Sequence, residues 1–462
     1  MTKAATALKR IFINKKGETD MTEGSILRHL IAFAFPLLIG NIFQMLYNMV
    51  DTWVVGNYVE NTAAFDAVGS VGPMINMLIG FFGGLASGAG VVISQYFGAG
   101  KEDRVRDTVH TAISITVILS AVFTVLGLLM IPTFLQISNT PAHVAPESTT
   151  YLTIYFAGIT GLLFYNMGAG ILRAVGDSTR PFLFLVVSAI VNTVLDLWFV
   201  IGFDLGVAGV AYATIIAQGV SALLIVISLM RTKACVRLSP RRLCIRWDIL
   251  KKIFRVGLPA AIQMAITAFS NVFVQSYING IENGAAMGGW TAYGKIDQVL
   301  LLPMQSLALA STTFLGQNLG KGQVDRAKAG LRTALLISVS CSVILMIPVM
   351  IFAPYLVAFF SEASVAYGTL FLRWISPFYV LCCFNQIYAG GLRGAGNSRA
   401  AMIIMLTSFV AYRQAYLFIV SNFISNDAIP IAMAYPSGWM LASLLTWLYY
   451  RRVDLGKNRL VE

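Results

Sequence analysis

Two acidic residues, Asp51 and Asp196, occur well inside long apolar segments of this sequence. A carboxylate at the centre of a lipid bilayer costs about 2.5–3.5 kcal/mol on insertion scales, so acids in such segments usually have a function. Polar residues recur beside both acids at the spacing of one helical face, namely Gln44 and Asn48 before Asp51, and Ser188 and Asn192 before Asp196. Each helix is therefore predicted to turn a hydrophilic face towards protein or water.

A shared pocket for these acids would have a definite chemistry. Two buried carboxyl groups repel each other when both are charged, so they favour the uptake of a proton. Together with amide and hydroxyl oxygens they would equally suit Na⁺. Asn192 and Asp196, four residues apart, can both reach one bound ion. The residues predict an ion site without choosing between H⁺ and Na⁺; the alternative is that both acids are structural, neutral and hydrogen-bonded to other helices.

The second half of the chain has no acid at the equivalent positions, which are Val274, Tyr412 and Tyr416. Its segment 253–279 is polar without charge. We expect the first half to bind the coupling ion and the second half to contribute a wall of neutral polar and aromatic side chains. Four amide side chains are predicted to line a substrate cavity: Gln44, Asn48, Gln263 and Asn271.

Four charged residues of the second half also lie in apolar segments. Lys295 and Asp297 either form a local pair or have a function. Arg373 lies close to the end of its segment, so its side chain can extend to the membrane surface. Arg413 is deeper and is predicted to have a structural partner.

Composition identifies the elements that position these residues. Of the 462 residues, 57% are hydrophobic and only 12% are charged, whereas a soluble protein carries about 25% charged residues. A helix crosses the hydrocarbon core with about 20 mainly apolar residues. Twelve segments qualify: 30–55, 68–94, 109–131, 151–171, 181–201, 207–230, 253–279, 289–315, 329–352, 366–390, 400–421 and 429–450. The sequence predicts an all-α polytopic membrane protein.

The loop charges predict the topology. All but three of the 33 Lys and Arg residues lie near the termini or the loops after even-numbered segments, and the loops after odd-numbered segments contain none. Because cytoplasmic loops carry the excess of Lys and Arg, both termini are predicted to be cytoplasmic, in the inner (plasma) membrane of the cell. The same pattern accounts for the net charge of +12 without a nucleic-acid partner.

The chain is internally repeated. Residues 95–104 (QYFGAGKEDR) return as 317–326 (QNLGKGQVDR), and residues 170–178 (GILRAVGDS) return as 390–398 (GGLRGAGNS). Since six spans separate the copies, both halves enter from the same side, as in transporters built from parallel repeats. The predicted parts are a cytoplasmic segment 1–25, a six-helix bundle 26–230, a basic linker 231–252, a six-helix bundle 253–450 and a tail 451–462.

Other function classes are not supported by the residues. The glycine-containing loops lack the strand and the Lys-Ser/Thr ending of phosphate-binding loops, so we expect no ATP-binding domain or subunit. No His, Cys or Ser arrangement indicates an enzyme, and the five cysteines lack metal-ligand spacing. We expect no cofactor other than the coupling ion, and a monomer whose partners are the bilayer and its small-molecule substrate.

The two six-helix halves, the basic linker, the Asn-x-x-x-Asp of residues 192–196 and the paired Leu-Arg-x-x-Gly-[Asp/Asn]-Ser loops resemble multidrug and toxic-compound extrusion (MATE) transporters over residues 26–450. The resemblance implies two bundles in a V and export of cationic or polyaromatic organic compounds in exchange for Na⁺ or H⁺. It further implies that Asp51, Asn192, Asp196 and Thr214 form the cation site. The absence of acids in the seventh and tenth segments resembles the DinF-like bacterial branch.

Two alternatives remain open. Lipid-linked oligosaccharide flippases share the fold and repeat of this superfamily, although their cavities are expected to be more cationic. A membrane channel or receptor without coupled transport is the third class. The sequence does not identify the physiological substrate.

Overall fold

The computed structural model describes residues 17–59, 62–137, 140–281, 285–457 and 459–461. These residues form helices and no strand. Eleven of the described helices are long and apolar enough to cross a membrane, and one bent helix pair makes a twelfth. The prediction of an all-α protein with twelve spans is confirmed. Most of the predicted N-terminal segment, residues 1–16, lies outside the described part.

The first half of the chain, here called the first lobe, consists of α2 (Ile26–Tyr58), α3 (Thr62–Gly98), α4 (Glu102–Ile137), α5 (Ala145–Ala157), α6 (Ile159–Ala174), α7 (Thr179–Leu197) and α8 (Gly206–Arg231). The second lobe consists of α9 (Trp247–Asn279), α10 (Ala285–Gly320), α11 (Val324–Ile351), α12 (Ala353–Ala358), α13 (Val365–Ile375), α14 (Tyr379–Gly394), α15 (Ser398–Leu406), α16 (Arg413–Ile419), α17 (Ala428–Ala432) and α18 (Ala434–Arg452). The linker between the lobes thus runs from residue 232 to residue 246.

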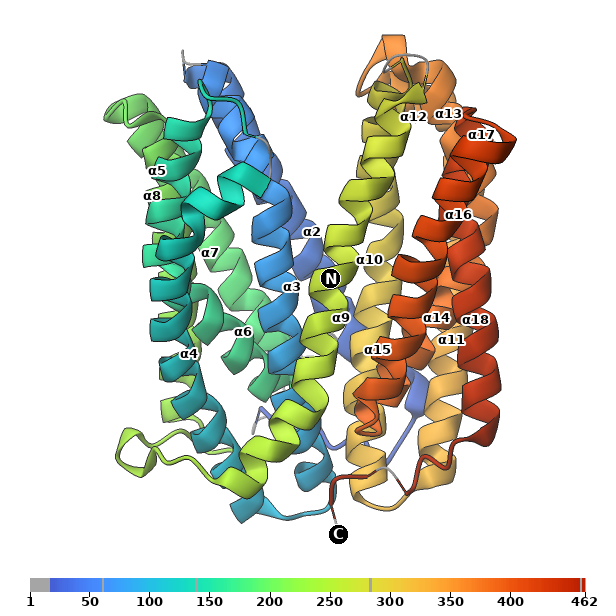
Figure 1. The fold of residues 1–462 in the computed structure, drawn as a ribbon. Helices are drawn as coiled ribbons and strands as arrows, with labels where there is room; N and C mark the ends of the chain where they lie inside the picture. The colour runs from blue at the N-terminus through green and yellow to red at the C-terminus, as the bar shows by residue number, and fades with distance from the viewer. Residues whose placement is uncertain (1–16, 60–61, 138–139, 282–284, 458, 462) are drawn as a thin grey trace, which may run out of the picture.

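The two lobes converge at one end of the molecule and diverge at the other (Figure 1). The converging end carries the linker, the α3–α4 turn, the α10–α11 turn and the C-terminus, and we call it the basic end. Between the lobes, α3 packs against α9 and α10, and α2 packs against α10. Large apolar side chains such as Leu129, Ile190 and Leu336 are more than half exposed, as expected where lipid takes the place of a protein core.

One break in the helices was not predicted. The fourth span bends by 49° between α5 and α6, at Gly158. A Cβ atom on Gly158 would lie 2.5 Å from the Cβ atom of Ile215 in α8. The glycine therefore permits both the bend and a close approach to α8. This position is not marked by a proline, so the sequence pattern predicts a continuous helix.

Glycines also bring the two lobes together where α3 crosses α9. A Cβ atom on Gly84 would lie 2.4 Å from the backbone nitrogen of Ala261, and one on Gly88 would lie 2.4 Å from the Cα atom of Gly257. Small residues of this kind let helix backbones approach closely inside membranes. The inter-lobe contact thus depends on the absence of side-chain atoms in α3.

Replacement of Gly84 tests this contact. Gly84→Ala is expected to lower the free energy of unfolding by about 1–3 kcal/mol because the new methyl group forces two backbones apart. Gly83, the preceding residue, is the matched control, because a methyl group added there would meet no atom of a neighbouring helix within 4 Å. Gly83→Ala should be neutral or stabilising, since alanine favours helices. Thermal unfolding of both variants in detergent measures the difference. Equal melting temperatures would contradict the close packing of α3 against α9.

Candidate ion site and inter-lobe cavity

The face of α7 that turns into the first lobe is polar, and its opposite face is apolar. Asn192 and Asp196 are buried, whereas Ile190 and Val194 are more than half exposed. Ser188, on the same buried face, donates a hydrogen bond of 2.7 Å to the carbonyl oxygen of Ala217 in α8. That bond fixes the rotation of α7 and turns both site residues inward, as the spacing predicts.

The structure brings the acids of α2 and α7 together. Asp51 and Asp196 lie close enough for their carboxyl groups to interact directly. Tyr151, from α5, lies near both acids and within reach of the Thr214 hydroxyl. Thr214 is buried and donates to the carbonyl oxygen of Val210 at 2.9 Å, so its oxygen lone pairs remain available as acceptors. The sequence analysis missed Tyr151, because a tyrosine in an apolar segment gives no signal of its own.

Several polar atoms of this pocket are buried without a partner. Within the described residues, the Asp51 Oδ1 atom, both polar atoms of the Asn192 amide and both Asp196 carboxyl oxygens have no hydrogen-bonding partner. Each such group costs about 1–3 kcal/mol if it stays unsatisfied. A proton shared between the carboxyl groups, or a cation bound by carboxylate, amide and hydroxyl oxygens, would satisfy them. This group of carboxylate, amide and hydroxyl oxygens therefore suits either a proton or Na⁺.

A cavity of about 560 Å³ lies between the two lobes, next to α3, α9 and α10. Two of the four amide residues proposed from the sequence, Gln263 and Asn271, line it. Gln44 and Asn48 are not among its lining residues. Asn41, nearer the start of α2, lines it instead and is within 3.5 Å of the Ser306 hydroxyl.

Two arginines that the sequence analysis left in the paired loops also line this cavity. Arg173 and Arg393 are equivalent residues of the repeat, in the last turns of α6 and α14. In the described part of the chain, no Asp or Glu lines the cavity. The repeated Leu-Arg-x-x-Gly pattern was the available signal, but it was interpreted as a pair of loops and not as part of the cavity wall.

Asp297, the acid in α10, is hydrogen-bonded within the second lobe and is not among the residues that line the inter-lobe cavity. The Tyr293 hydroxyl donates to the Asp297 carboxyl at 3.1 Å, and the Tyr379 hydroxyl donates to the same oxygen. Lys295 is exposed and forms no ion pair with Asp297 among the described contacts. The local-pair interpretation was wrong because residues two apart on a helix point in different directions. Arg373 is exposed, with its Nε atom 3.5 Å from the Met350 carbonyl oxygen.

Arg413 has structural partners. Its guanidinium donates to the Ser270 hydroxyl at 2.8 Å and to the Asn271 side-chain oxygen at 2.9 Å. It also lies over the Tyr435 ring, 4.9 Å from the centroid. Ser270 in turn accepts a hydrogen bond of 3.0 Å from Gln414. The buried charge is thus distributed over acceptors of α9 and an aromatic face, and Asn271 serves both Arg413 and the cavity wall.

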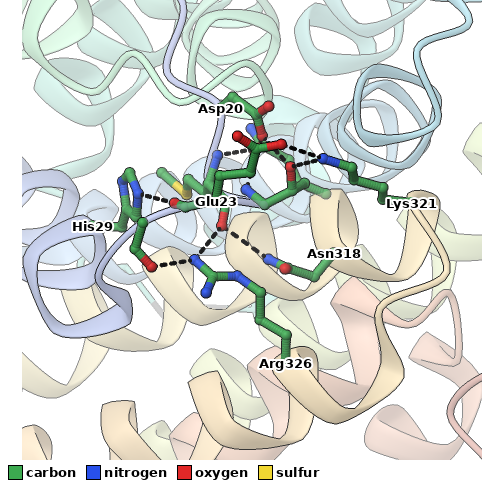
Figure 2. A network of polar contacts seen from close by, with 10 residues as sticks. Asp20, Glu23, His29, Asn318, Lys321 and Arg326 are labelled. Atoms are coloured by element: carbon green, nitrogen blue, oxygen red, sulfur yellow. Dashed lines mark hydrogen bonds and ion pairs between the residues drawn. The ribbon is translucent and has the colours of Figure 1, made fainter.

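At the basic end, residues 17–24 contact both lobes. The Thr19 amide donates to the Val175 carbonyl oxygen of the first lobe at 2.8 Å. In the second lobe, the Lys321 ammonium lies 2.9 Å from the Glu23 carboxylate. Figure 2 shows this second set of contacts, made by Asn318 of α10, Lys321 of the α10–α11 turn and Arg326 of α11. The segment thereby ties the lobes together where they converge.

Two glutamines of the repeat reinforce this closure in a symmetric way. Gln95 of α3 donates to the Gly394 carbonyl oxygen of the second lobe at 2.9 Å, and Gln317 of α10 donates to the Ala174 carbonyl oxygen of the first lobe at 3.0 Å. Each side-chain oxygen accepts from a terminal segment, at 2.6 Å for Gln95 and 2.9 Å for Gln317. The cavity is therefore closed at the basic end by buried hydrogen bonds between lobes.

Comparison with known sequences identifies relatives along nearly the whole chain. The sequence model of the MatE family matches residues 36–198 and 259–413. "Probable multidrug resistance protein YpnP" of Bacillus subtilis (strain 168) is 28% identical over 434 residues, covering 94% of this chain and 96% of the relative. The "FAD transporter" of Shewanella oneidensis is 25% identical, covering 86% of this chain and 88% of the relative.

Comparison with solved structures agrees on the fold. A structure described as the "Outward-facing conformation of a multidrug resistance MATE family transporter of the MOP superfamily" matches with a TM-score of 0.88. It is 23% identical, and the match covers 95% of this chain and 97% of that one.

Replacement of Ser270 tests the structural assignment of Arg413. Ser270→Ala removes a buried acceptor from the Arg413 guanidinium, so the free energy of unfolding should fall by about 1–3 kcal/mol. Ser276→Ala, at an exposed position on the same helix, is the matched control and should change stability by less than about 0.5 kcal/mol. Thermal unfolding in detergent measures both, and an unaffected Ser270→Ala protein would show that Arg413 does not depend on this contact.

Proposed function

This chain belongs to the MATE family of multidrug efflux transporters, and from that premise we propose that it exports organic cationic or polyaromatic compounds in exchange for Na⁺ or H⁺. The proposed site of the coupling ion is formed by Asp51, Asn192, Asp196 and Thr214. The observation that carries the proposal is the group of buried, unpartnered oxygens on Asp51, Asn192 and Asp196. It is a site for a transported ion and not for catalysis, because the family consists of transporters and not of enzymes.

The proposed mechanism is alternating access between the two lobes. We assign the basic end to the cytoplasm because Lys and Arg concentrate there, so the conformation described is closed inwards and open outwards. A bound Na⁺ or proton neutralises the paired carboxyl groups and removes their mutual repulsion. The packing of α2 against α7 and α8 then differs between the occupied and the free site, and α2 also packs against α10 of the other lobe. This connects ion binding to the contacts between lobes.

A lipid-linked precursor flippase is the second candidate. It is favoured by one observation, the two arginines in a cavity that is lined by no acid within the described residues. The names of the relatives do not decide between substrates, since they include multidrug resistance proteins and an FAD transporter. A flippase would neither bind nor transport organic cations.

Transport by purified protein in liposomes tests the coupling site. With an imposed inward Na⁺ or H⁺ gradient, the wild type should drive efflux of a cationic dye such as ethidium, measured by fluorescence. Asp51→Asn and Asp196→Asn should each lower the gradient-driven rate at least tenfold, because each removes a charge that the ion must neutralise, and a single removed charge interaction is worth more than about 1.4 kcal/mol.

Asp204→Asn is the matched control, since Asp204 is an exposed acid shortly after α7. It should transport at the wild-type rate. Wild-type rates in the Asp51→Asn and Asp196→Asn proteins would contradict the assignment of the site. Comparing the two gradients identifies the ion.

A further inference from the structure

We propose that Arg173 and Arg393 form an anion-binding subsite at the base of the inter-lobe cavity, where they receive a carboxylate or phosphate group of the substrate. This inference rests on the proposed function, because it takes the inter-lobe cavity as part of the transport path. It extends the expected substrates from organic cations to zwitterionic and anionic amphiphiles.

The repeat places the two guanidinium groups at equivalent positions. Arg173 lies in the last turn of α6 and Arg393 in the last turn of α14, and both line the same cavity. One belongs to each lobe. A ligand between them would therefore contact both lobes at once, at the end of the cavity that the inter-lobe hydrogen bonds close.

Neither arginine has an anionic partner in the described part of the chain. Arg393 is 7% exposed and Arg173 is partly buried, and both line the cavity. Within the described residues no hydrogen bond or ion pair involves either guanidinium. By contrast, Arg413 donates to two side-chain oxygens, and Arg180 pairs with Asp177. A charge removed from water is costly unless it is paired. The charges of this cavity are thus arranged for an anion that the chain itself does not supply.

The helix ends do not account for these arginines. Cations near the C-terminus of a helix often interact with its last carbonyl groups. Here the Ala174 carbonyl oxygen accepts a hydrogen bond from Gln317, and the Gly394 carbonyl oxygen accepts one from Gln95. In each helix the two preceding carbonyl oxygens accept hydrogen bonds from backbone amides of the turn that follows the helix. The guanidinium groups consequently remain available to a ligand.

The rest of the lining indicates what kind of molecule carries the anion. The cavity volume of about 560 Å³ is in the range of sites for drug-sized molecules. Met264, Met405 and Phe409 supply apolar and aromatic contacts, and Gln263 and Thr312 supply hydrogen-bonding groups. Guanidinium groups bind carboxylate and phosphate through paired hydrogen bonds. The fitting ligand is an aromatic or apolar compound with one such group.

Equilibrium binding of two matched dyes tests the subsite. Rhodamine B carries a free carboxylate, and its ethyl ester has the same ring system without that charge. Fluorescence polarisation with purified protein in neutral detergent gives both affinities. Arg173→Gln/Arg393→Gln should bind rhodamine B about tenfold more weakly than the wild type, as expected for loss of charge-assisted hydrogen bonds, and should bind the ester within about twofold of the wild type.

Two controls separate charge from structure. Arg173→Lys/Arg393→Lys keeps both charges and should recover most of the rhodamine B affinity. Arg399→Gln removes an exposed guanidinium from the same end of the second lobe and should have no effect. Equal losses for both dyes, or an unchanged preference for the carboxylate dye in the double Gln variant, would overturn the proposal. If that variant does not fold, as judged by thermal unfolding, the same comparison is made with each single Gln variant.

A competition experiment identifies the source of the anion. The binding of rhodamine B is repeated in nanodiscs of phosphatidylcholine and of phosphatidylglycerol, and with added inorganic phosphate. Competition by phosphatidylglycerol, lost in the double Gln variant, would assign the subsite to a lipid headgroup; competition by phosphate alone would assign it to a soluble substrate. No competition by either would exclude phosphate groups and restrict the subsite to carboxylates. Because no ion gradient is present, these results are independent of whether Asp51 and Asp196 couple transport.

Discussion

The burial of two carboxyl groups side by side, in a helix bundle surrounded by lipid, is the constraint from which the function follows. Asp51 and Asp196 lie close to each other, and buried oxygens of both lack hydrogen-bond partners in the described structure. A pocket of this kind is unfavourable until a proton or a cation enters it. Ser188 of α7 holds that helix against α8 through a hydrogen bond to the Ala217 carbonyl oxygen. We infer that the free energy of the first lobe depends on whether an ion is bound at this site.

The other charged groups in the membrane have different surroundings and, we infer, different roles. Asp297 is satisfied by two tyrosine hydroxyls, and Arg413 is satisfied by acceptors on α9. Arg173 and Arg393 have no such partners and line the space between the lobes. Partnered charges belong to the structure of the second lobe, whereas unpartnered charges mark the places where an ion or a substrate group is expected.

Much of this architecture was predictable, because the bilayer imposes strict requirements on composition and length. The twelve spans followed from apolar segments of about 20 residues, and the inward face of α7 followed from the spacing of Asn192 and Asp196. The bend at Gly158 was not predictable, since it depends on a contact with α8. Arg173 and Arg393 were assigned to loops because an apolar segment followed by Arg and Gly is the same sequence pattern whether the helix ends inside the protein or at its surface. Tyr293 lies four residues before Asp297 on the same helix, whereas Tyr379 belongs to α14 and is brought to Asp297 only by the tertiary structure.

The central claim is that a cation or proton binds between Asp51 and Asp196, and calorimetry of the purified protein tests it most directly. Na⁺ is titrated into Na⁺-free protein at several pH values and in two buffers that differ in ionisation enthalpy. We predict saturable heat from Na⁺, or buffer-dependent heat from proton exchange when substrate is added, and either signal should vanish when both acids are replaced by asparagine. If wild-type and doubly substituted proteins give the same heats under all these conditions, no coupling ion binds at this pair.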